Sequence, residues 1–172
     1  MSDTLITVVA IALAAVLMFV FPLKTMSDRT DDVSQLTVET ATTEFVDEIR
    51  TTGKITQDKY SKFLEAIGST GNTYNVEMEV KVLDENPGKK STQATRDKIG
   101  ENVYYSLYTS QIEEKLKSGT YNLKEGDIVS VNVKNTNQTL SQQLKNFFYT
   151  VTGKDTYTIA ASHGGIVTAT GK

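Results

Sequence analysis

The chain has 172 residues and a formal net charge of -3, so it is long enough for one globular domain with an appendage and lacks the basic excess typical of nucleic-acid-binding proteins. It contains no cysteine, which excludes disulfides, thiol catalysis and cysteine-based metal sites. Its aliphatic residues are concentrated at the N-terminus, and the rest of the chain is polar and rich in threonine and asparagine.

The first predicted element is an apolar helix over residues 5–23. This run carries no charged residue, and Thr7 and Pro22 alone interrupt its apolar character. At about 1.5 Å per residue, a helix of this length comes close to the roughly 30 Å needed to cross the hydrocarbon core of a bilayer. The run is apolar on every side, which predicts a helix inserted in a membrane.

Two other interpretations fit this run less well. A cleavable signal peptide has a basic N-terminal region and a site of small residues at its end, but this chain begins with MSDT and continues after the run with KTMSD. A buried helix of a soluble core is apolar all round too, but the remaining chain is too small and too polar to enclose one.

The same helix is predicted to continue to residue 52 as an amphipathic segment. A kink is expected near Pro22, because proline removes a backbone hydrogen bond and clashes with the preceding turn. No glycine and no second proline occur before Gly53, where the helix should end after about 75 Å. One side of its second half should face a domain through an apolar stripe made of Met26, Val33, Leu36, Phe45, Val46 and Ile49.

Residues 53–172 are predicted to form a separate head that folds on its own, and it opens with a short helix. Thr56 is a typical N-cap, Ile55 can pack against Tyr60 as a hydrophobic staple, and Gly68 supplies the end of the helix. The buried face of this helix should consist of Tyr60, Phe63, Leu64 and Ile67.

Alternating apolar and polar residues predict the strands of the head. The alternation is strict over residues 74–83, and it recurs over residues 102–108 and within residues 125–135. The inward side chains should be Tyr74, Val76, Met78, Val80, Val82, Val129, Val131 and Val133. A final pair of strands is expected to form a hairpin that turns at His163-Gly164-Gly165.

Capping boxes, in which a side chain at each end bonds the other residue's backbone, predict two more helices. Ser110 with Glu113 should open a helix that buries Ile112 and Leu116. A second box, Thr139 with Gln142, should open a helix that ends at Gly153 and lines one face with Leu140, Leu144, Phe147, Phe148 and Val151. The resulting fold class is α+β, a mostly antiparallel sheet with short helices on one face.

The sequence predicts no catalytic, cofactor or metal site, so the chain is not expected to be an enzyme. The single histidine, His163, has no acidic neighbour in sequence and is interpreted as a turn residue. The acidic group of Asp28, Asp31 and Asp32 lacks the spacing of a calcium loop and is interpreted as a solvated turn. No phosphate-binding loop, dinucleotide fingerprint or nucleophile elbow occurs.

A long N-terminal helix that is apolar in its first half and carries a proline at position 22, followed by an α+β head, resembles a subunit of the type IV filament superfamily. That superfamily includes type IV pilins, tight-adherence pilins and type II secretion pseudopilins. Residues 5–21 resemble its apolar assembly segment, and Pro22 its helix-breaking proline. The chain departs from the family at Leu5, where pilins usually carry a glutamate, and no basic leader ending in glycine precedes the run. The resemblance covers residues 1–52.

The resemblance implies that the apolar helices of many copies bundle into the core of an extracellular filament, with the heads on its surface. Small residues in the run would let neighbouring helices approach closely. In the family, the acid at position 5 is thought to neutralise the amino terminus of a neighbouring subunit, and we expect Asp3 to take that role here. The expected assembly residues are Asp3, Ala10, Ala12, Ala14, Ala15 and Pro22.

Two hypotheses for function remain. In the first, the chain is a structural subunit whose partners are other copies of itself in a helical homo-oligomer and the lipid bilayer before assembly, with no nucleic acid and no small-molecule substrate. The alternative is a single-span, membrane-anchored binding or accessory protein of a secretion or conjugation apparatus. Lys24 and Arg29 follow the run and favour a cytoplasmic head by the positive-inside rule. The threonine- and asparagine-rich head nevertheless suits an extracellular surface, and we expect it outside the cell membrane.

Overall fold

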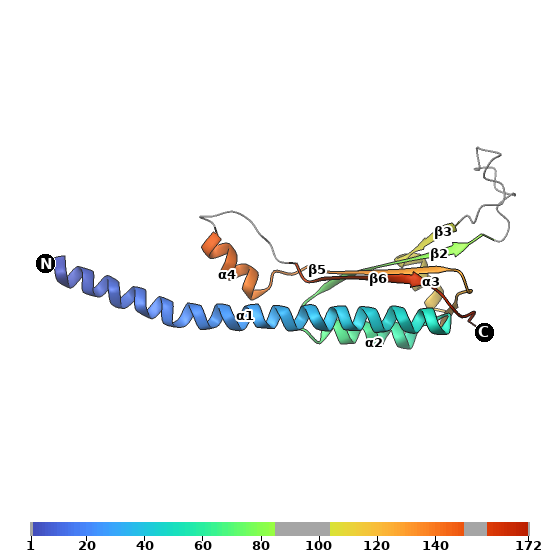
Figure 1. The fold of residues 1–172 in the computed structure, drawn as a ribbon, viewed down its shortest axis with the longest axis horizontal. Coiled ribbons are helices and arrows are strands. Elements are labelled where there is room, and N and C mark those ends of the chain that lie inside the picture. Colours follow the sequence, from blue (N-terminus) through green and yellow to red (C-terminus); the bar gives the residue numbers. More distant parts are fainter. Residues whose placement is uncertain (1, 85–103, 150–157, 172) are drawn as a thin grey trace, which may run out of the picture.

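The computed structural model describes residues 2–84, 104–149 and 158–171, which form one long helix and an α+β head (Figure 1). Helix α1 spans Ser2–Thr52 and ends at Gly53, whose positive φ of 64° suits the turn out of a helix. After it come β1 (Lys54–Thr56), α2 (Gln57–Gly68), β2 (Tyr74–Leu83), β3 (Tyr104–Tyr108), α3 (Thr109–Leu116), β4 (Thr120–Asn122), β5 (Ile128–Asn135), α4 (Leu140–Tyr149) and β6 (Ala160–Ile166). The predicted fold class is confirmed.

The described strands form two antiparallel sheets. The larger has the order β3-β2-β5-β6, and the smaller pairs β1 with β4, two short strands that the sequence did not predict. In the larger sheet β2 runs beside β5 from Tyr74 opposite Asn135 to Lys81 opposite Ile128. Helices α1 and α2 lie side by side along one face of this sheet (Figure 1), so the core forms between them and the strands.

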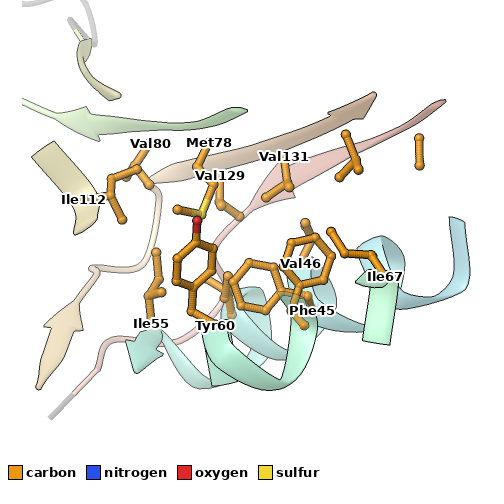
Figure 2. Close-up of a cluster of buried hydrophobic side chains, with 14 of the residues drawn as sticks. Phe45, Val46, Ile55, Tyr60, Ile67, Met78, Val80, Ile112, Val129 and Val131 are labelled. Atoms are coloured by element: carbon orange, nitrogen blue, oxygen red, sulfur yellow. The ribbon is translucent and has the colours of Figure 1, made fainter. Parts of the chain in front are cut away.

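The core joins α1 to the head. Figure 2 shows side chains of the helices meeting the inward side chains of β2 and β5, among them Met78, Val80, Val129 and Val131. The ring of Phe45 on α1 stacks on that of Phe63 on α2, with centroids 4.6 Å apart. Helix α1 supplies the buried residues Val38, Phe45, Val46 and Ile49. Residues 53–172 therefore do not hold the whole core, and their folding without α1 stays a prediction.

The predicted apolar stripe of α1 is right at its C-terminal end and wrong nearer the apolar run. Buried as predicted are Phe45, Val46 and Ile49. The other three, Met26, Val33 and Leu36, are largely exposed, with exposed fractions between 58% and 69%. The buried positions at that level are polar, namely Ser27, Asp31 and Ser34. The reason is that this part of α1 faces the polar first turn of α4, so hydrogen bonding decides which side is buried.

The predicted hairpin at His163-Gly164-Gly165 is wrong, because all three residues lie inside the continuous strand β6. The two glycines allow close packing within a strand. A Cβ on Gly165 would lie 2.6 Å from Nε of Arg50, and one on Gly164 would lie 2.9 Å from the carbonyl oxygen of Val129. Glycine therefore lets α1 and β5 approach β6 at these positions.

Helix α1 also covers the outer edge of β6. The side-chain amide of Gln35 donates to the carbonyl oxygen of Ala160 at 2.7 Å and accepts the N–H of Ala160 at 3.0 Å, as a neighbouring strand would. Near the other end, Nε of Arg50 donates to the carbonyl oxygen of Ile166 at 3.1 Å. The helix thus occupies edge groups that would otherwise be open to another chain.

Two predicted helix starts are confirmed. The Thr56 hydroxyl accepts the N–H of Lys59 at 3.3 Å at the start of α2. At the start of α4, the Gln142 side chain accepts the N–H of Thr139 at 3.1 Å, and the Thr139 hydroxyl accepts the N–H of Gln142 at 3.2 Å. Local side-chain chemistry therefore sets both starts.

The predicted start of α3 at Ser110 is wrong by two positions. The N-cap is Tyr108, whose N–H is accepted by the Gln111 side chain at 3.0 Å. The intervening Thr109 is held to the sheet, because its hydroxyl accepts the N–H of Met78 at 2.7 Å. That tertiary contact places the helix directly after β3. The predicted burial of its inner face is confirmed for Ile112 and Leu116.

Part of the prediction for α4 is untested. Leu140, predicted to be buried, is 50% exposed. The predicted inner side chains Phe147, Phe148 and Val151 and the predicted end at Gly153 lie outside the described side chains and residues. The first two residues of the strand expected over residues 102–108 also lie outside the described residues.

The division of α1 into buried and exposed positions gives a direct test. We expect Phe45→Ala to lower the free energy of unfolding by about 3 to 5 kcal/mol, because it removes a buried aromatic ring and leaves a cavity. Leu36→Ala, on the same helix, should change it by less than about 0.5 kcal/mol, because Leu36 is exposed. Urea unfolding in an uncharged detergent, followed by near-ultraviolet circular dichroism, measures both. Equal losses would contradict the arrangement of α1 on the sheet.

Candidate functional site

The apolar segment of α1 extends beyond the head and none of its most apolar stretch is buried (Figure 1). Its exposed large apolar side chains are between 44% and 75% exposed, and they are Leu5, Ile6, Val8, Val9, Ile11, Leu13, Val16, Leu17, Met18, Phe19, Phe21 and Leu23. The described chain thus contains one helix long and apolar enough to cross a membrane. That part of the sequence prediction is confirmed.

The side-chain hydroxyl in the apolar run is satisfied within the helix. The Thr7 hydroxyl donates to the carbonyl oxygen of Asp3 at 2.7 Å, so the hydroxyl in the middle of the run has a partner. Pro22 lies inside α1 and has no N–H to donate. The helix continues through it, and Figure 1 shows the N-terminal part of α1 curving away from the axis of the second half. The segment can therefore enter an apolar environment without leaving a side-chain donor unpaired.

The four alanines of the run fall on two sides of α1. At about 100° per residue, Ala10 and Ala14 share one side, and Ala12 and Ala15 share the opposite side. All four are exposed. A helix with small residues on two opposite sides can accept a close neighbour on each, as a bundle of many helices requires.

Asp3 lies in the first turn of α1. A carboxylate there interacts favourably with the positive end of the helix dipole, whatever else it binds. Its predicted contact with a neighbouring amino terminus stays a prediction, because the structure describes a single copy from residue 2 onward.

The acidic group predicted to be a solvated turn instead joins α1 to α4. Oδ2 of Asp28 accepts from Nζ of Lys24 at 2.7 Å, and its Oδ1 accepts from the hydroxyl of Ser141 and lies 3.3 Å from Nζ of Lys145. Oδ2 of the buried Asp31 accepts from the hydroxyl of Thr139 at 2.7 Å. The contacts with Thr139, Ser141 and Lys145 could not be predicted from the sequence, because these residues are more than a hundred positions from Asp28 and Asp31.

The pKa values of Asp28 and Asp31 are shifted in opposite directions. Hydrogen bonds from Lys24 and Ser141 lower the pKa of Asp28 to about 2. Burial raises the pKa of Asp31 above its usual value, and the bond from Thr139 opposes this effect in part. Asp28 therefore stabilises the junction in its ionised form, while Asp31 is costly to ionise there.

His163 also has an acidic partner that sequence distance concealed. Its Nε2 lies 3.2 Å from Oδ1 of Asp47 on α1, and the same oxygen lies 2.8 Å from Nη1 of Arg50. The contacts with His163 and then Arg50 lower the pKa of Asp47. This group ties the middle of β6 to α1. Within the described residues, no group of three or more histidine or acidic side chains could hold a metal ion.

Comparison with protein-family models, with curated proteins and with solved structures finds no match to this chain. The function proposed below therefore rests on the residues and geometry of the molecule itself.

The junction between α1 and α4 predicts a pH-dependent stability. A carboxyl group with a folded pKa of about 2 and an unfolded value of 3.8 stabilises the fold above the unfolded value and loses that contribution as the pH falls toward 2. We expect Asp28→Asn to lower the free energy of unfolding by up to about 1 kcal/mol at pH 7, after allowance for solvent screening. The difference between parent and variant should shrink between pH 4 and pH 2.

Urea unfolding of the two chains at several pH values measures this difference. Asp32→Asn is the matched control, because Asp32 is a neighbouring exposed carboxylate. If the difference in free energy of unfolding between the parent and Asp28→Asn did not change with pH, ionised Asp28 would not be what stabilises the junction.

Proposed function

We propose that the chain is a structural subunit, similar to a type IV pilin, that assembles into a filament through the first half of α1. The proposal combines an apolar helix that nothing in the described chain covers with a head built onto the same helix. In this account the apolar segment lies in a bilayer before assembly and against other copies afterwards. The two environments are similarly apolar, so close packing of small residues can favour the assembled state.

The observation that carries the proposal is the inverted polarity of α1 just after the apolar run. There the side chains facing the head are polar, and the exposed ones include Met26, Val33 and Leu36. Met26 and Val33 are seven residues apart and share a side of the helix with Phe19 of the run. This apolar line reaches about 15 Å beyond Leu23. In a simple anchor this apolar line would stay exposed to water, whereas in a filament a neighbouring helix would cover it.

The continuity of α1 gives the assembly a mechanical basis. One helix runs without interruption from the apolar segment into the core beneath the sheet. The side chains of Gln35 and Arg50 on α1 hold that helix to the head by donating to backbone carbonyl oxygens at the two ends of β6. Packing of the first half of α1 would therefore fix the position of the head. We propose a single-pass subunit with the head outside the cell.

The alternative is a membrane-anchored binding protein whose helix only spans the bilayer. An open strand edge on the head, described in the next subsection, favours a binding role. The two candidates differ in what happens when detergent is removed. A subunit should form filaments of uniform width in negative stain, whereas an anchor should form irregular aggregates or stay bound to detergent.

Substitution at the alanines tests the close-packing argument. We expect Ala14→Leu and Ala12→Leu to reduce the yield of filaments severalfold, because each adds bulk on a side where helices approach. Insertion into a membrane should be unchanged or improved, because leucine is more apolar than alanine. Ile11→Leu, which keeps the volume, is the control. Equal filament yields from all variants would favour the anchor.

The apolar line beyond the run predicts a second effect. We expect Val33→Ser to reduce filament yield while leaving the urea midpoint of the detergent-solubilised subunit unchanged, because Val33 is exposed in the single copy. The control is Thr37→Ser, one turn further along α1, which introduces the same serine side chain in place of a residue that already bears a hydroxyl. A loss of subunit stability in Val33→Ser would show that Val33 belongs to the head's core and remove this support.

The N-terminal acid gives a third assembly prediction. We expect Asp3→Ala to reduce assembly, because a neighbouring amino terminus buried in an apolar core would lose its partner at a cost of several kcal/mol. Adding Leu5→Glu to that variant should restore part of the yield. Normal assembly of Asp3→Ala, measured by filament sedimentation, would place the amino terminus in water.

A further inference from the structure

One edge of the larger sheet is open. Strand β3 pairs with β2 only from Glu79 to Leu83, because the chain leaves the sheet at Thr109 to begin α3. Strand β2 continues to Tyr74 and keeps its other neighbour, β5, along that length. The stretch of β2 from Tyr74 to Glu77 therefore has a paired side and an unpaired side.

The backbone of this stretch presents a donor and an acceptor to the open side. Antiparallel pairing alternates the direction of backbone groups, and the bond from the N–H of Met78 to the Thr109 hydroxyl marks the residues that point outward. Val76 is two residues away and points the same way. Among the described residues, none hydrogen-bonds to its N–H or its carbonyl oxygen on that side. At the opposite edge, Gln35 and Arg50 occupy the equivalent groups of β6.

The open edge borders a hollow of about 610 Å³ with acidic walls. Its lining includes Glu77 and Glu79 of β2 and Glu113 of α3. The closest partners of these carboxylates are neutral, because Glu77 accepts from Asn75, Glu79 from Ser106 and Glu113 from Tyr60. The ammonium group of Lys81 lies 4.0 Å from Glu79, at the limit of an ion pair. The hollow therefore favours a positively charged occupant.

We propose that the β2 edge from Tyr74 to Glu77 binds an extended peptide segment of a partner protein that carries lysine or arginine at alternate positions. The segment pairs with the N–H and carbonyl oxygen of Val76 as an added strand. Its basic side chains lie on the solvated face beside Glu77, and the residues between them lie beside Val76 on the inner face. The site does not depend on filament assembly and would serve either proposed function.

The test uses the full chain in an uncharged detergent and the end-blocked peptide Lys-Val-Lys-Val-Lys as probe. We expect the peptide to slow hydrogen exchange of the Val76 amide severalfold, measured by nuclear magnetic resonance. The same peptide with N-methyl groups on its two valines, the residues that lie beside Val76, keeps its charge but cannot complete the strand pairing. It should bind much more weakly. Equal binding of both peptides, or an unchanged Val76 amide, would overturn the proposal.

Charge reversal supplies the second arm. Glu77→Lys lies on the solvated face, so the fold should be retained, and the affinity for Lys-Val-Lys-Val-Lys should fall by at least about fivefold as an attraction across the strands becomes a repulsion. Glu125→Lys makes the same change of charge at an exposed turn away from the edge, and its affinity should match the parent. Equal losses in the two variants would mean that the peptide follows net charge, which would also overturn the proposal.

Discussion

The second half of α1 packs beneath the sheet, and the rest of the molecule depends on that contact. Phe45, Val46 and Ile49 of this helix meet the inward side chains of β2 and β5. The stack of Phe45 on Phe63 adds α2 to the same core. Because α1 is continuous, this contact also sets the direction in which the apolar segment leaves the head. The apolar segment and the part of the core that α1 supplies therefore belong to one continuous helix.

The polar contacts of α1 complement this packing. Gln35 and Arg50 take up backbone groups at the two ends of β6, and Asp47 holds His163 between them. Close to the apolar segment, Asp28 and Asp31 bind Ser141 and Thr139 at the start of α4. The head is thus fixed along most of the second half of the helix, and the apolar side chains at that level are left on the outside. In the proposed filament, this division of polar and apolar sides provides a surface for a neighbouring helix.

Elements set by local rules could be predicted from the sequence. The apolar run, the alternation in β2 and β5, and the capping pair of Thr139 and Gln142 depend on neighbours in the chain. The errors arose where distant residues decide. The two glycines of β6 resemble a turn, yet Gly165 makes room for Arg50 and Gly164 for the backbone of β5, both far away in sequence. The buried side of α1 near Asp31 was misassigned, because its partner Thr139 is 108 residues away.

In the candidate sites, too, local features could be predicted and features set by distant residues could not. The exposed apolar segment was predictable, since its length and composition are local properties. The open edge at Val76 was not, because it depends on where β3 ends and α3 begins. Thr109 sets that point through a contact with Met78 across the sheet. An alternating pattern predicts a strand, but it does not say which strand will lack a neighbour.

The central claim is that copies of the apolar segment cover one another, and cysteine cross-linking tests it most directly. The chain has no cysteine, so a single one introduced at residue 11, 12, 13 or 14 reports on contacts of that position alone. These four positions cover a full turn of the helix. After detergent removal and mild oxidation, we expect disulfide-linked dimers at two or more of them. Monomers at all four positions, in material that has lost its detergent, would contradict it.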